Sequence, residues 1–373
     1  MKIAIEAQRI FRINKHGMDF VALETIRQIQ TLDKKNEYYI FVAPGDDKCL
    51  EESENMKIIE LRAFGGYPIW EQVALPLAIN KIDPDIVHCT SNTAPLFLKQ
   101  KLIVTLHDII FLEKKAQKNK SLYQNLGRLY RRLIVPKIIS KASKVITVSE
   151  FECTRIKDFL NLKEDKISYI HNGYNKHFTK KDNPKDIYKK YIDQDDYIFF
   201  LGNTDPKKNT DLTLCAYAKY IEKSNNKNIS CLLIADLKES TIDELLKINN
   251  IEWIKPFIYY PGYIPNADLP YIYSGAKLFL YPSLRESFGI PILEAMACGT
   301  PIITSNTSAI PEIAGPGAIL VDPKNIDILS DKIFLLLNNQ ESREKQIEYG
   351  LGRVKLFSWE KTASELIRLY KNI

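Results

Sequence analysis

The 373-residue sequence lacks several features that would assign it to a class of protein at once. No apolar run approaches the roughly eighteen residues of a membrane-spanning helix, and charged residues interrupt the N-terminal apolar stretch too early for a secretory signal. The six cysteines are scattered without a Cys-x-x-Cys pair, which is typical of reduced cysteines rather than of disulfides or a metal site. These absences favour a cytoplasmic globular protein.

Two further absences narrow the function. No Gly-x-Gly-x-x-Gly follows the first apolar strand, which disfavours a nicotinamide dehydrogenase. No nucleic-acid-binding motif is present, and we expect no nucleic-acid partner. The net charge of +6 is uneven, because residues 1–176 hold 28 Lys and Arg against 21 Asp and Glu, whereas the remainder holds 24 against 25. Any basic surface for a partner therefore belongs to the first half.

Short apolar strands alternate with helix-period segments along the chain. The predicted strands are 2–7, 38–44, 56–61, 85–90, 101–108, 144–150, 197–203, 230–236, 278–283, 301–305 and 318–323. The predicted helices are 18–32, 122–139, 210–222, 240–249, 291–298 and 325–338. This alternation favours parallel sheets that are covered by helices on both faces.

The polar segment 172–190 interrupts the alternation and is interpreted as an interdomain linker. We therefore predict an α/β protein with two Rossmann-like, doubly wound parallel-sheet domains facing an interdomain cleft. Residues 1–174 form the first domain and residues 175–357 the second, while a C-terminal helix at 358–373 is expected to pack back on the first. Ligands of such sheets lie beyond the carboxyl ends of the strands.

The stretch ESFGIPILEAMACGT, residues 286–300, places Glu286 and Glu294 eight residues apart. Gly289 and Pro291 exclude one continuous helix, because proline is tolerated only in a helix's first turn. The helix is expected to begin near Pro291, and its N-terminus favours an anion. A carboxylate there can accept hydrogen bonds from two neighbouring sugar hydroxyls. On spacing alone, the alternative is that Glu294 complements the helix dipole and Glu286 is solvated.

This stretch resembles the retaining glycosyltransferases of family 4, which have the GT-B fold and carry a Glu-x7-Glu element. The similar run continues as far as AILVDP. Further matches are FLGNTDPKKN for a basic Gly-x-x-x-Pro-Arg/Lys-Lys-Asn loop, VTLHDIIF for a strand ending in His-Asp, and YPIWEQVALP for a Trp-x-Gln segment. The resemblance covers most of the chain, except roughly residues 175–195.

The resemblance implies a role for each matched residue. Glu294 would hold the ribose of a nucleotide-diphosphate sugar, and Glu286 would contact the transferred sugar. Lys207 and Lys208 would hold the diphosphate, and His107 would lie near the donor sugar, so that His107, Lys208 and Glu286 form the predicted catalytic set. Backbone groups would contact sugar hydroxyls and phosphate at Phe288, Gly289, Ile290 and Pro291. Without the resemblance, His107 would be a packed histidine and the two lysines a solvated turn.

Two positions depart from the family pattern. Many members place Arg directly after the glycine of the basic loop, where this chain has Asn203, so Lys207 and Lys208 must supply the cationic stabilisation, with Lys208 as the first choice. The loop after the first strand is usually glycine-rich, whereas NKHGMDF contains only Gly17, which still lets backbone approach the donor phosphate or the acceptor. Asp19 either contacts an acceptor hydroxyl or caps the following helix, and we favour the cap.

The chemistry implied is glycosyl transfer with retention at the anomeric carbon, in which the leaving diphosphate gains charge. Cations and backbone amides placed in advance stabilise such charge, so neither a metal nor another cofactor is expected. The Asp-Pro-Asp at 83–85 fits a metal-binding string but is interpreted as structural.

Residues 114–149 contain ten Lys or Arg and no acid. Apolar residues follow near-helical spacing at 122, 126, 129, 133 and 134, and Pro136 is expected to kink or interrupt the helix. Such a segment can lie on anionic membrane. We favour this peripheral contact for residues 114–144, at the inner face of the membrane, because many enzymes of the family that the chain resembles act on lipid-linked or membrane-proximal glycans. The alternative is a domain helix with a solvated basic face. Weak acceptor- or membrane-binding candidates are Arg128, Arg131 and Arg132.

We therefore predict a retaining, metal-independent glycosyltransferase that moves a hexosyl unit, by best guess mannosyl, from a GDP- or UDP-linked donor. The acceptor would be a glycan or a lipid-linked oligosaccharide in cell-surface polysaccharide synthesis. Two alternatives stay open: a nucleotide-sugar 2-epimerase of the same fold, and a non-catalytic glycan- or nucleotide-binding protein.

Overall fold

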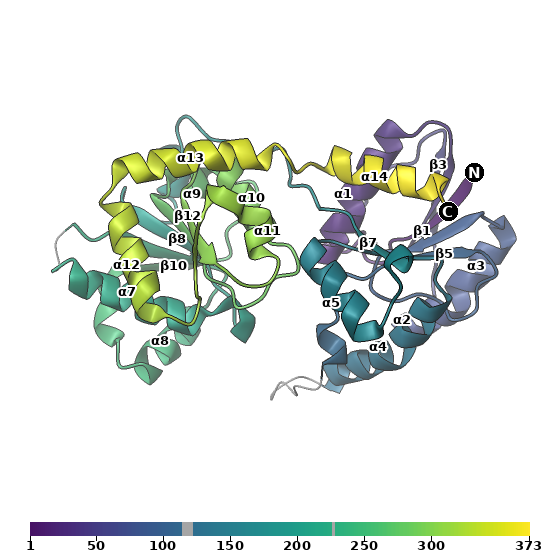
Figure 1. The fold of residues 1–373 in the computed structure, drawn as a ribbon, viewed down its shortest axis with the longest axis horizontal. Helices are drawn as coiled ribbons and strands as arrows, with labels where there is room; N and C mark the ends of the chain where they lie inside the picture. Colours follow the sequence, from purple (N-terminus) through teal and green to yellow (C-terminus); the bar gives the residue numbers. More distant parts are fainter. Residues whose placement is uncertain (114–121, 226–227) are drawn as a thin grey trace. The chain divides into compact units, whose positions relative to one another are not determined.

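The computed structural model describes residues 1–113, 122–225 and 228–373. It divides into two compact units: Met1–Gly173 with Trp359–Ile373 form the first, and Tyr174–Ser358 form the second. Each unit is built on one parallel sheet with helices packed against it (Figure 1). The predicted α/β, doubly wound fold class is thereby confirmed, while the cleft expected between the domains stays a prediction.

The first unit contains a seven-stranded sheet in the order β3-β2-β1-β4-β5-β6-β7, with every neighbouring pair parallel. Its strands are β1 (Lys2–Glu6), β2 (Glu37–Val42), β3 (Met56–Glu60), β4 (Ile86–Cys89), β5 (Lys101–Thr105), β6 (Lys144–Thr147) and β7 (Ile167–Tyr169). The chain winds outward from β1 to β3 and then crosses back to β4. Central residues such as Ile3, Val87 and Ile103 are fully buried, because helices cover both faces.

One face of this sheet packs on α1 (Gly17–Leu32) and α14 (Trp359–Lys371), which share a core through Ile26, Leu366 and Tyr370 (Figure 1). The other face packs on helices whose buried residues form a second core. The remaining helical elements of the unit are α2 (Tyr67–Ile69), the π-helix η1 (Trp70–Ala74), α3 (Leu75–Ile82), η2 (Ile110–Leu112), α4 (Leu122–Lys141), α5 (Glu150–Leu160) and η3 (Glu164–Lys166). The C-terminal helix therefore completes the first unit rather than the second.

The second unit contains a six-stranded parallel sheet in the order β10-β9-β8-β11-β12-β13. Its strands are β8 (Tyr197–Leu201), β9 (Cys231–Ala235), β10 (Ile258–Gly262), β11 (Leu278–Tyr281), β12 (Ile302–Ser305) and β13 (Ile319–Val321). Its helical elements are α6 (Lys185–Tyr188), η4 (Pro206–Lys208), α7 (Thr210–Lys223), α8 (Glu239–Ile248), η5 (Glu252–Phe257), α9 (Leu269–Gly275), α10 (Ile290–Ala297), α11 (Ile310–Ala314), η6 (Gly315–Gly317), α12 (Ile326–Leu337) and α13 (Gln340–Val354). The strand order reverses between β8 and β11, where ligands of open α/β sheets bind.

The structure adds two edge strands that the periodicity does not indicate. β7 has three residues and only Ile167 is buried, while β10 contains a proline and a glycine and shifts register against β9. Pro136 was expected to kink or interrupt the basic helix; an interruption is wrong, because α4 continues through it to Lys141, while the kink stays a prediction. Buried Val135 and Ile138 on either side of the proline hold that helix against the sheet.

Candidate functional site

Two loops at the carboxyl edge of the second sheet bring opposite charges together. Lys208 lies between β8 and α7, and Glu286 lies between β11 and α10. The Lys208 Nζ is 2.6 Å from Glu286 Oε1 and 2.9 Å from the Tyr281 hydroxyl. Tyr281 in turn donates to Glu286 Oε1 at 2.9 Å, so the three side chains form one hydrogen-bonded cluster. The structure therefore joins the lysine assigned to the diphosphate with the glutamate assigned to the sugar.

The two lysines of the basic loop differ in their surroundings. Lys208 is 23% exposed and lies over the Tyr281 ring, 5.0 Å from its centroid. Lys207 is 39% exposed, and its Nζ is 3.6 Å from the Asp205 carboxylate. The Lys207 main-chain carbonyl accepts from the Leu284 N–H at 2.7 Å. Lys207 thus connects the loops through its backbone, whereas Lys208 connects them through its charge.

Asn209, the last residue of the basic motif, holds this edge together. Its side-chain amide donates to the carbonyl oxygens of Pro282 at 3.0 Å and Pro323 at 2.7 Å, in the loops that follow β11 and β13. The sequence motif contains this asparagine, but nothing local reveals that it connects three loops. Asn203, the departure from the family pattern, is exposed and accepts from the Asp205 N–H at 2.8 Å.

Tyr281 and Ser308 are site residues that the sequence reasoning missed. Tyr281 is the last residue of β11 and is buried, with its ring under the Lys208 ammonium and its hydroxyl bonded to Glu286. Ser308, after β12, accepts from the Glu286 main-chain N–H at 3.0 Å. An aromatic residue with a polar tip at the carboxyl end of a buried strand is the signal that indicates Tyr281.

Helix α10 begins at Ile290, with Pro291 in its first turn, which confirms the predicted start near Pro291. Gly289 precedes it with a φ of +105°, a backbone conformation that strains any residue with a side chain. The Phe288 side chain is buried and meets the Phe357 ring edge-on at 6.0 Å. Its ring therefore anchors the loop from inside the unit.

Glu294 lies one turn into α10, where the Tyr273 hydroxyl donates to its Oε2 at 3.5 Å. Burial raises the pKa of Glu294 to about 8, against the opposing effect of that hydrogen bond. Burial, and then the charges of Glu286 and Glu294, raise the pKa of Tyr281 well above its usual value. Both acids of the Glu-x7-Glu element therefore lie within electrostatic reach of the same tyrosine.

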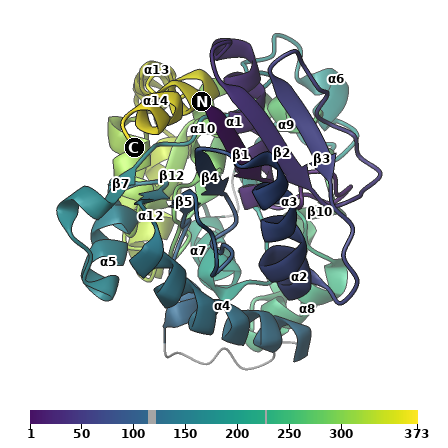
Figure 2. The same ribbon diagram turned by 90° about the vertical axis from the view of Figure 1, so that its right-hand side faces the viewer.

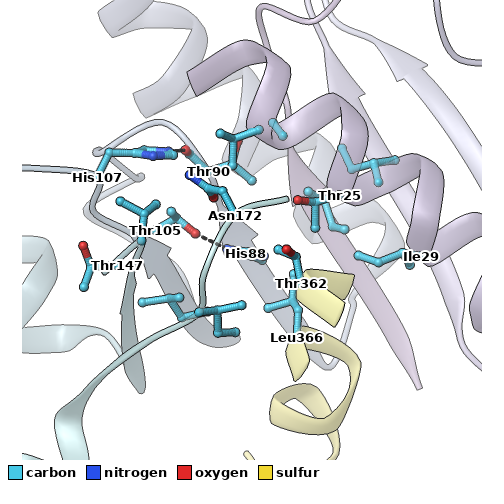
Figure 3. Close-up of a pocket in the computed structure, with 17 residues that line it drawn as sticks. Thr25, Ile29, His88, Thr90, Thr105, His107, Thr147, Asn172, Thr362 and Leu366 are labelled. Atoms are coloured by element: carbon cyan, nitrogen blue, oxygen red, sulfur yellow. Dashed lines mark hydrogen bonds between the residues drawn. The ribbon is translucent and has the colours of Figure 1, made fainter. Parts of the chain in front are cut away.

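The carboxyl edge of the first sheet holds a buried and neutral group of polar side chains (Figure 3). His107 follows β5, and its ring Nε2 lies 3.0 Å from the Thr90 carbonyl oxygen. Because a carbonyl only accepts, Nε2 carries the proton and Nδ1 is the acceptor of the neutral ring. Burial lowers the pKa of His107, which favours that neutral form. The main-chain N–H of His107 donates to Asn92 Oδ1 at 2.6 Å.

His88 is the structural partner of this group. Its ring nitrogens lie 2.7 Å from the Tyr370 hydroxyl on α14 and 2.7 Å from Thr105 Oγ1, the bond drawn in Figure 3. Burial, with a smaller effect of His107, lowers the pKa of His88 to about 3. A cavity of about 40 Å³ lies between both histidines, α1 and α14. It has room for a few water molecules but not for a hexose.

Gly17 and Asp19 lie at the start of α1. Gly17 is exposed, and a Cβ built on it would meet nothing within 4 Å, so the fold itself does not require glycine here. Asp19 is buried, and its Oδ2 accepts from the His16 main-chain N–H at 2.9 Å while Oδ1 lies 3.0 Å from Arg9 Nε. Asp19 therefore caps the helix, as favoured above.

The three arginines of α4 do not share one environment. The Arg128 Nε donates to the Phe111 carbonyl at 3.3 Å, and the Arg131 guanidinium lies over the Phe111 ring at 5.8 Å. Only Arg132 among them is exposed. The part of the predicted basic segment at 114–121 lies outside the described residues. Every helix in the described ranges is too short or too polar to cross a bilayer.

The Asp-Pro-Asp at 83–85 has local structural roles. Asp85 Oδ2 accepts from the Lys2 main-chain N–H at 2.8 Å, and Asp83 ends α3 with a left-handed φ of +50°. In the part of the chain that the structure describes, no three His, Cys, Asp or Glu side chains gather as a metal site would require.

Comparison with known proteins identifies the family through both units. The model described as Glycosyltransferase Family 4 matches residues 17–178, and the model described as Glycosyl transferases group 1 matches residues 182–353. The chain belongs to glycosyltransferase family 4. The family recognised from the Glu-x7-Glu stretch and the basic loop is thereby confirmed, while the roles of individual residues in this glycosyltransferase stay proposals.

Two curated relatives and one solved structure are similar to this family-4 glycosyltransferase. The O-antigen chain mannosyltransferase B of Escherichia coli is 29% identical over 73% of this chain and 70% of that protein. The serotype-specific mannosyltransferase WbdA of Escherichia coli is 24% identical over 78% of this chain, which spans only 37% of that protein. Sucrose-phosphate synthase from Thermosynechococcus elongatus superposes with a TM-score of 0.79 at 20% identity, over 100% of this chain and 98% of that one. The last similarity concerns the fold alone.

Proposed function

We propose that this chain is a retaining glycosyltransferase that moves a hexosyl unit, by best guess mannosyl, from a nucleotide-diphosphate sugar to a glycan or lipid-linked oligosaccharide. The proposed context is the synthesis of a cell-surface polysaccharide. Support for mannosyl and for polysaccharide comes from the relatives, which are named as O-antigen and serotype-specific mannosyltransferases.

The cluster of Lys208, Glu286 and Tyr281 is the observation that carries the proposal. A nucleotide sugar presents a diphosphate, which needs cations, beside sugar hydroxyls, which a carboxylate can accept. Lys208 and Glu286 offer these two groups 2.6 Å apart. The first turn of α10 adds backbone N–H groups and the positive end of a helix dipole. We assign the diphosphate to Lys208 with help from Lys207, and the transferred sugar to Glu286.

Donor binding would then exchange partners within the cluster. Lys208 turns from Glu286 to the diphosphate, and Glu286 accepts from sugar hydroxyls instead. During the reaction Lys208 stabilises the charge that develops on the leaving diphosphate, so that no metal is required. Glu294 accepts from the ribose hydroxyls, and the unprotonated Nδ1 of His107 accepts from a hydroxyl of the transferred sugar. Gly17 leaves space at the start of α1 for the diphosphate or the acceptor.

Thermal unfolding with GDP, UDP and their hexose derivatives tests the donor. A nucleotide at about one hundred times its Kd stabilises the folded protein by about 2.7 kcal/mol, so the correct base raises the Tm and the other does not. NMR of the purified product then reads the anomeric configuration, and activity in EDTA reads the need for metal. Inversion at the anomeric carbon would contradict the retaining mechanism, and full loss of activity in EDTA would contradict metal independence.

The two alternatives differ from the proposal in what they do with donor alone. An epimerase converts the nucleotide sugar without acceptor, and the new sugar is visible by chromatography. A non-catalytic binding protein leaves both donor and acceptor unchanged. Transfer that occurs only when acceptor is added, and that is lost in Glu286→Ala, excludes both.

A further inference from the structure

Helices α9 and α10 pack side by side in the second unit (Figure 1, Figure 2). Their contact brings Tyr273, near the end of α9, against Glu294 in α10. The Tyr273 hydroxyl lies 3.5 Å from Glu294 Oε2, and within the described ranges no other group donates a hydrogen bond to that carboxylate. The acid assigned to the ribose therefore depends on one tyrosine for its orientation.

Three aromatic rings hold the Tyr273 ring in place. The ring is fully buried, and each neighbour meets it edge-on, with centroid distances of 5.1 Å to Phe199, 5.0 Å to Phe279 and 6.0 Å to Phe178. Edge-to-face contact is a favoured geometry between aromatic rings, so these neighbours fix the plane of the ring as well as its position. Packing alone thereby aims the Tyr273 hydroxyl at α10.

The same packing reaches the other acid of the Glu-x7-Glu element. Phe279 stacks on Tyr281 with 5.6 Å between the ring centroids, and the Tyr281 hydroxyl donates to Glu286. Each acid is thus bonded to a tyrosine, and the two tyrosines share Phe279 as a neighbour. Glu286 also has the Lys208 cation beside it, whereas Glu294 lacks a cationic partner in the part of the chain that the structure describes. We call these five rings the aromatic cluster: Phe178, Phe199, Tyr273, Phe279 and Tyr281.

The segment that joins the two units completes the aromatic cluster. The sequence predicts a polar linker at 172–190, whereas Phe178 within it is only 2% exposed and packs on Tyr273. A hydrogen bond holds the segment there, because the Lys181 main-chain N–H donates to Ser274 Oγ on α9 at 3.0 Å. The linker therefore supplies one wall of the support behind the ribose acid.

We propose that Tyr273 is a positioning residue for Glu294, and that Phe178 extends this support to the segment joining the units. The inference rests on the proposed function, in which Glu294 accepts from the ribose hydroxyls. Tyr273 is fully buried and would itself touch no substrate. Charge-assisted hydrogen bonds are shorter than neutral ones, so the 3.5 Å contact should tighten when Glu294 ionises. Nucleotide affinity then depends on the hydroxyl and on the rings that aim it.

The effect of the hydroxyl should be visible in the pH dependence of nucleotide binding. Burial raises the pKa of Glu294 to about 8, and the hydrogen bond from Tyr273 opposes that rise. Tyr273→Phe keeps the ring and removes the opposing bond, so the pH at which binding levels off should move upward. Below that pH the variant should bind about two- to tenfold more weakly, the usual effect of one hydrogen bond. Calorimetric titration with GDP and UDP across neutral and alkaline pH measures both changes.

The other ionisable groups that face Glu294 are also buried. Tyr281 on β11 and Cys298, directly after α10, have raised pKa values, chiefly through burial and in part through the charges of nearby acids, including Glu294. The pKa of Cys298 is raised to about 12. Both groups therefore stay neutral where Glu294 titrates, and a shifted profile in Tyr273→Phe reports on Glu294.

Double-mutant cycles separate positioning from a purely structural role. In the Glu294→Ala background, Tyr273→Phe should have no further effect on nucleotide affinity, because the hydroxyl acts through the carboxylate. With Glu294 present, Tyr273→Phe should raise the donor KM and leave kcat within about twofold, since the ribose is bound equally in the ground and transition states. Phe178→Leu should weaken binding in the same direction, and it should add nothing once the Tyr273 hydroxyl is gone.

Tyr217→Phe is the matched control. Its buried hydroxyl donates to the Ser230 carbonyl at 3.0 Å in the same unit, outside the aromatic cluster. This variant should lower the Tm while leaving the pH profile of nucleotide binding unchanged. An unchanged profile in Tyr273→Phe, or an equal loss of affinity in the Glu294→Ala background, would overturn the proposal. Failure of the wild type to bind either nucleotide would overturn the proposed function, and this inference with it.

Discussion

The two sheets have the same parallel, doubly wound architecture, but the side chains at their carboxyl edges differ in charge. At the edge of the second sheet, Lys208 and Glu286 form an ion pair around the Tyr281 hydroxyl. At the edge of the first, His107 and His88 are buried and bonded to neutral oxygens. One edge therefore suits a charged diphosphate, whereas the other suits neutral hydroxyls.

Burial has the same physical effect at both edges, because it disfavours the charged form of any ionisable side chain. It raises the pKa of Glu294 to about 8 and lowers the pKa of His88 to about 3. Lys208 and Glu286 are half-buried side by side, and each compensates the charge of the other. The comparison teaches that a shared fold sets where a site lies, while strand-end residues and burial set what it binds.

The largest effect on catalysis should come from removing the Lys208 cation at the carboxyl edge of the second sheet. Lys208→Ala is expected to lower kcat by about 10²–10³, because on the proposed assignment the leaving diphosphate would lose its half-buried counter-charge. Steady-state assays with saturating donor measure this. Lys207→Ala is the matched control and should cost less than tenfold, since Lys207 is more exposed and contributes mainly its backbone. Equal losses in the two variants would contradict the distinction between them.

At the carboxyl edge of the first sheet, His88→Leu should lower the stability of the protein rather than its catalytic rate. The change leaves the hydroxyls of Tyr370 and Thr105 buried without their partner, which costs about 2 kcal/mol in the free energy of unfolding. Urea denaturation measures that loss. His107→Leu, the same substitution at the other histidine, should instead lower kcat/KM. A stable His88→Leu enzyme with impaired transfer would assign His88 to the reaction.

Titration of Glu294 should make nucleotide binding depend on pH. On the proposed assignment the ionised carboxylate would accept two ribose hydroxyls, so affinity should rise by up to about tenfold per unit as pH rises toward 8 and level off above. Calorimetry across this range measures the change. Glu294→Gln should show a flat profile with weaker binding at high pH. An identical pH profile in the variant would remove Glu294 from the ribose site.

The same pKa has a consequence for stability. The pKa of Glu294 is near its ordinary value of 4.5 in the unfolded chain and about 8 in the folded protein, so the folded protein holds an extra proton between these two pH values. Its contribution to stability is therefore present at low pH and is lost as pH rises through that window. Thermal unfolding of wild type and Glu294→Gln at several pH values measures the difference.

The smallest effect should come from Asp19. Asp19→Ala removes the acceptor for the His16 N–H and the partner of Arg9, and should cost about 1 kcal/mol of stability. The acceptor KM should stay within twofold, because the carboxylate is used inside the helix cap. Asp19→Asn keeps the capping oxygen and should recover part of the stability. A large rise in acceptor KM with unchanged stability would favour acceptor binding instead.

Local patterns predicted much of this protein. The start of α10 follows from Gly289 and Pro291, and the central strands follow from continuous apolar runs. The edge strands β7 and β10 were missed because they are short and half-exposed, so their sequences carry little hydrophobic signal. Tyr281 was missed because its role depends on a lysine that is distant in the chain.

The sequence by itself determined the α/β class, the family and the two loops that carry the candidate site, because these depend on periodicity and on residues close together in the chain. Only the tertiary structure decided that Lys208 meets Glu286, 78 residues away, since that contact requires β8 and β11 to be neighbours in the sheet. It also decided which face of α4 is exposed. Helical spacing identifies an apolar face, but only packing determines whether that face lies against the core or against solvent.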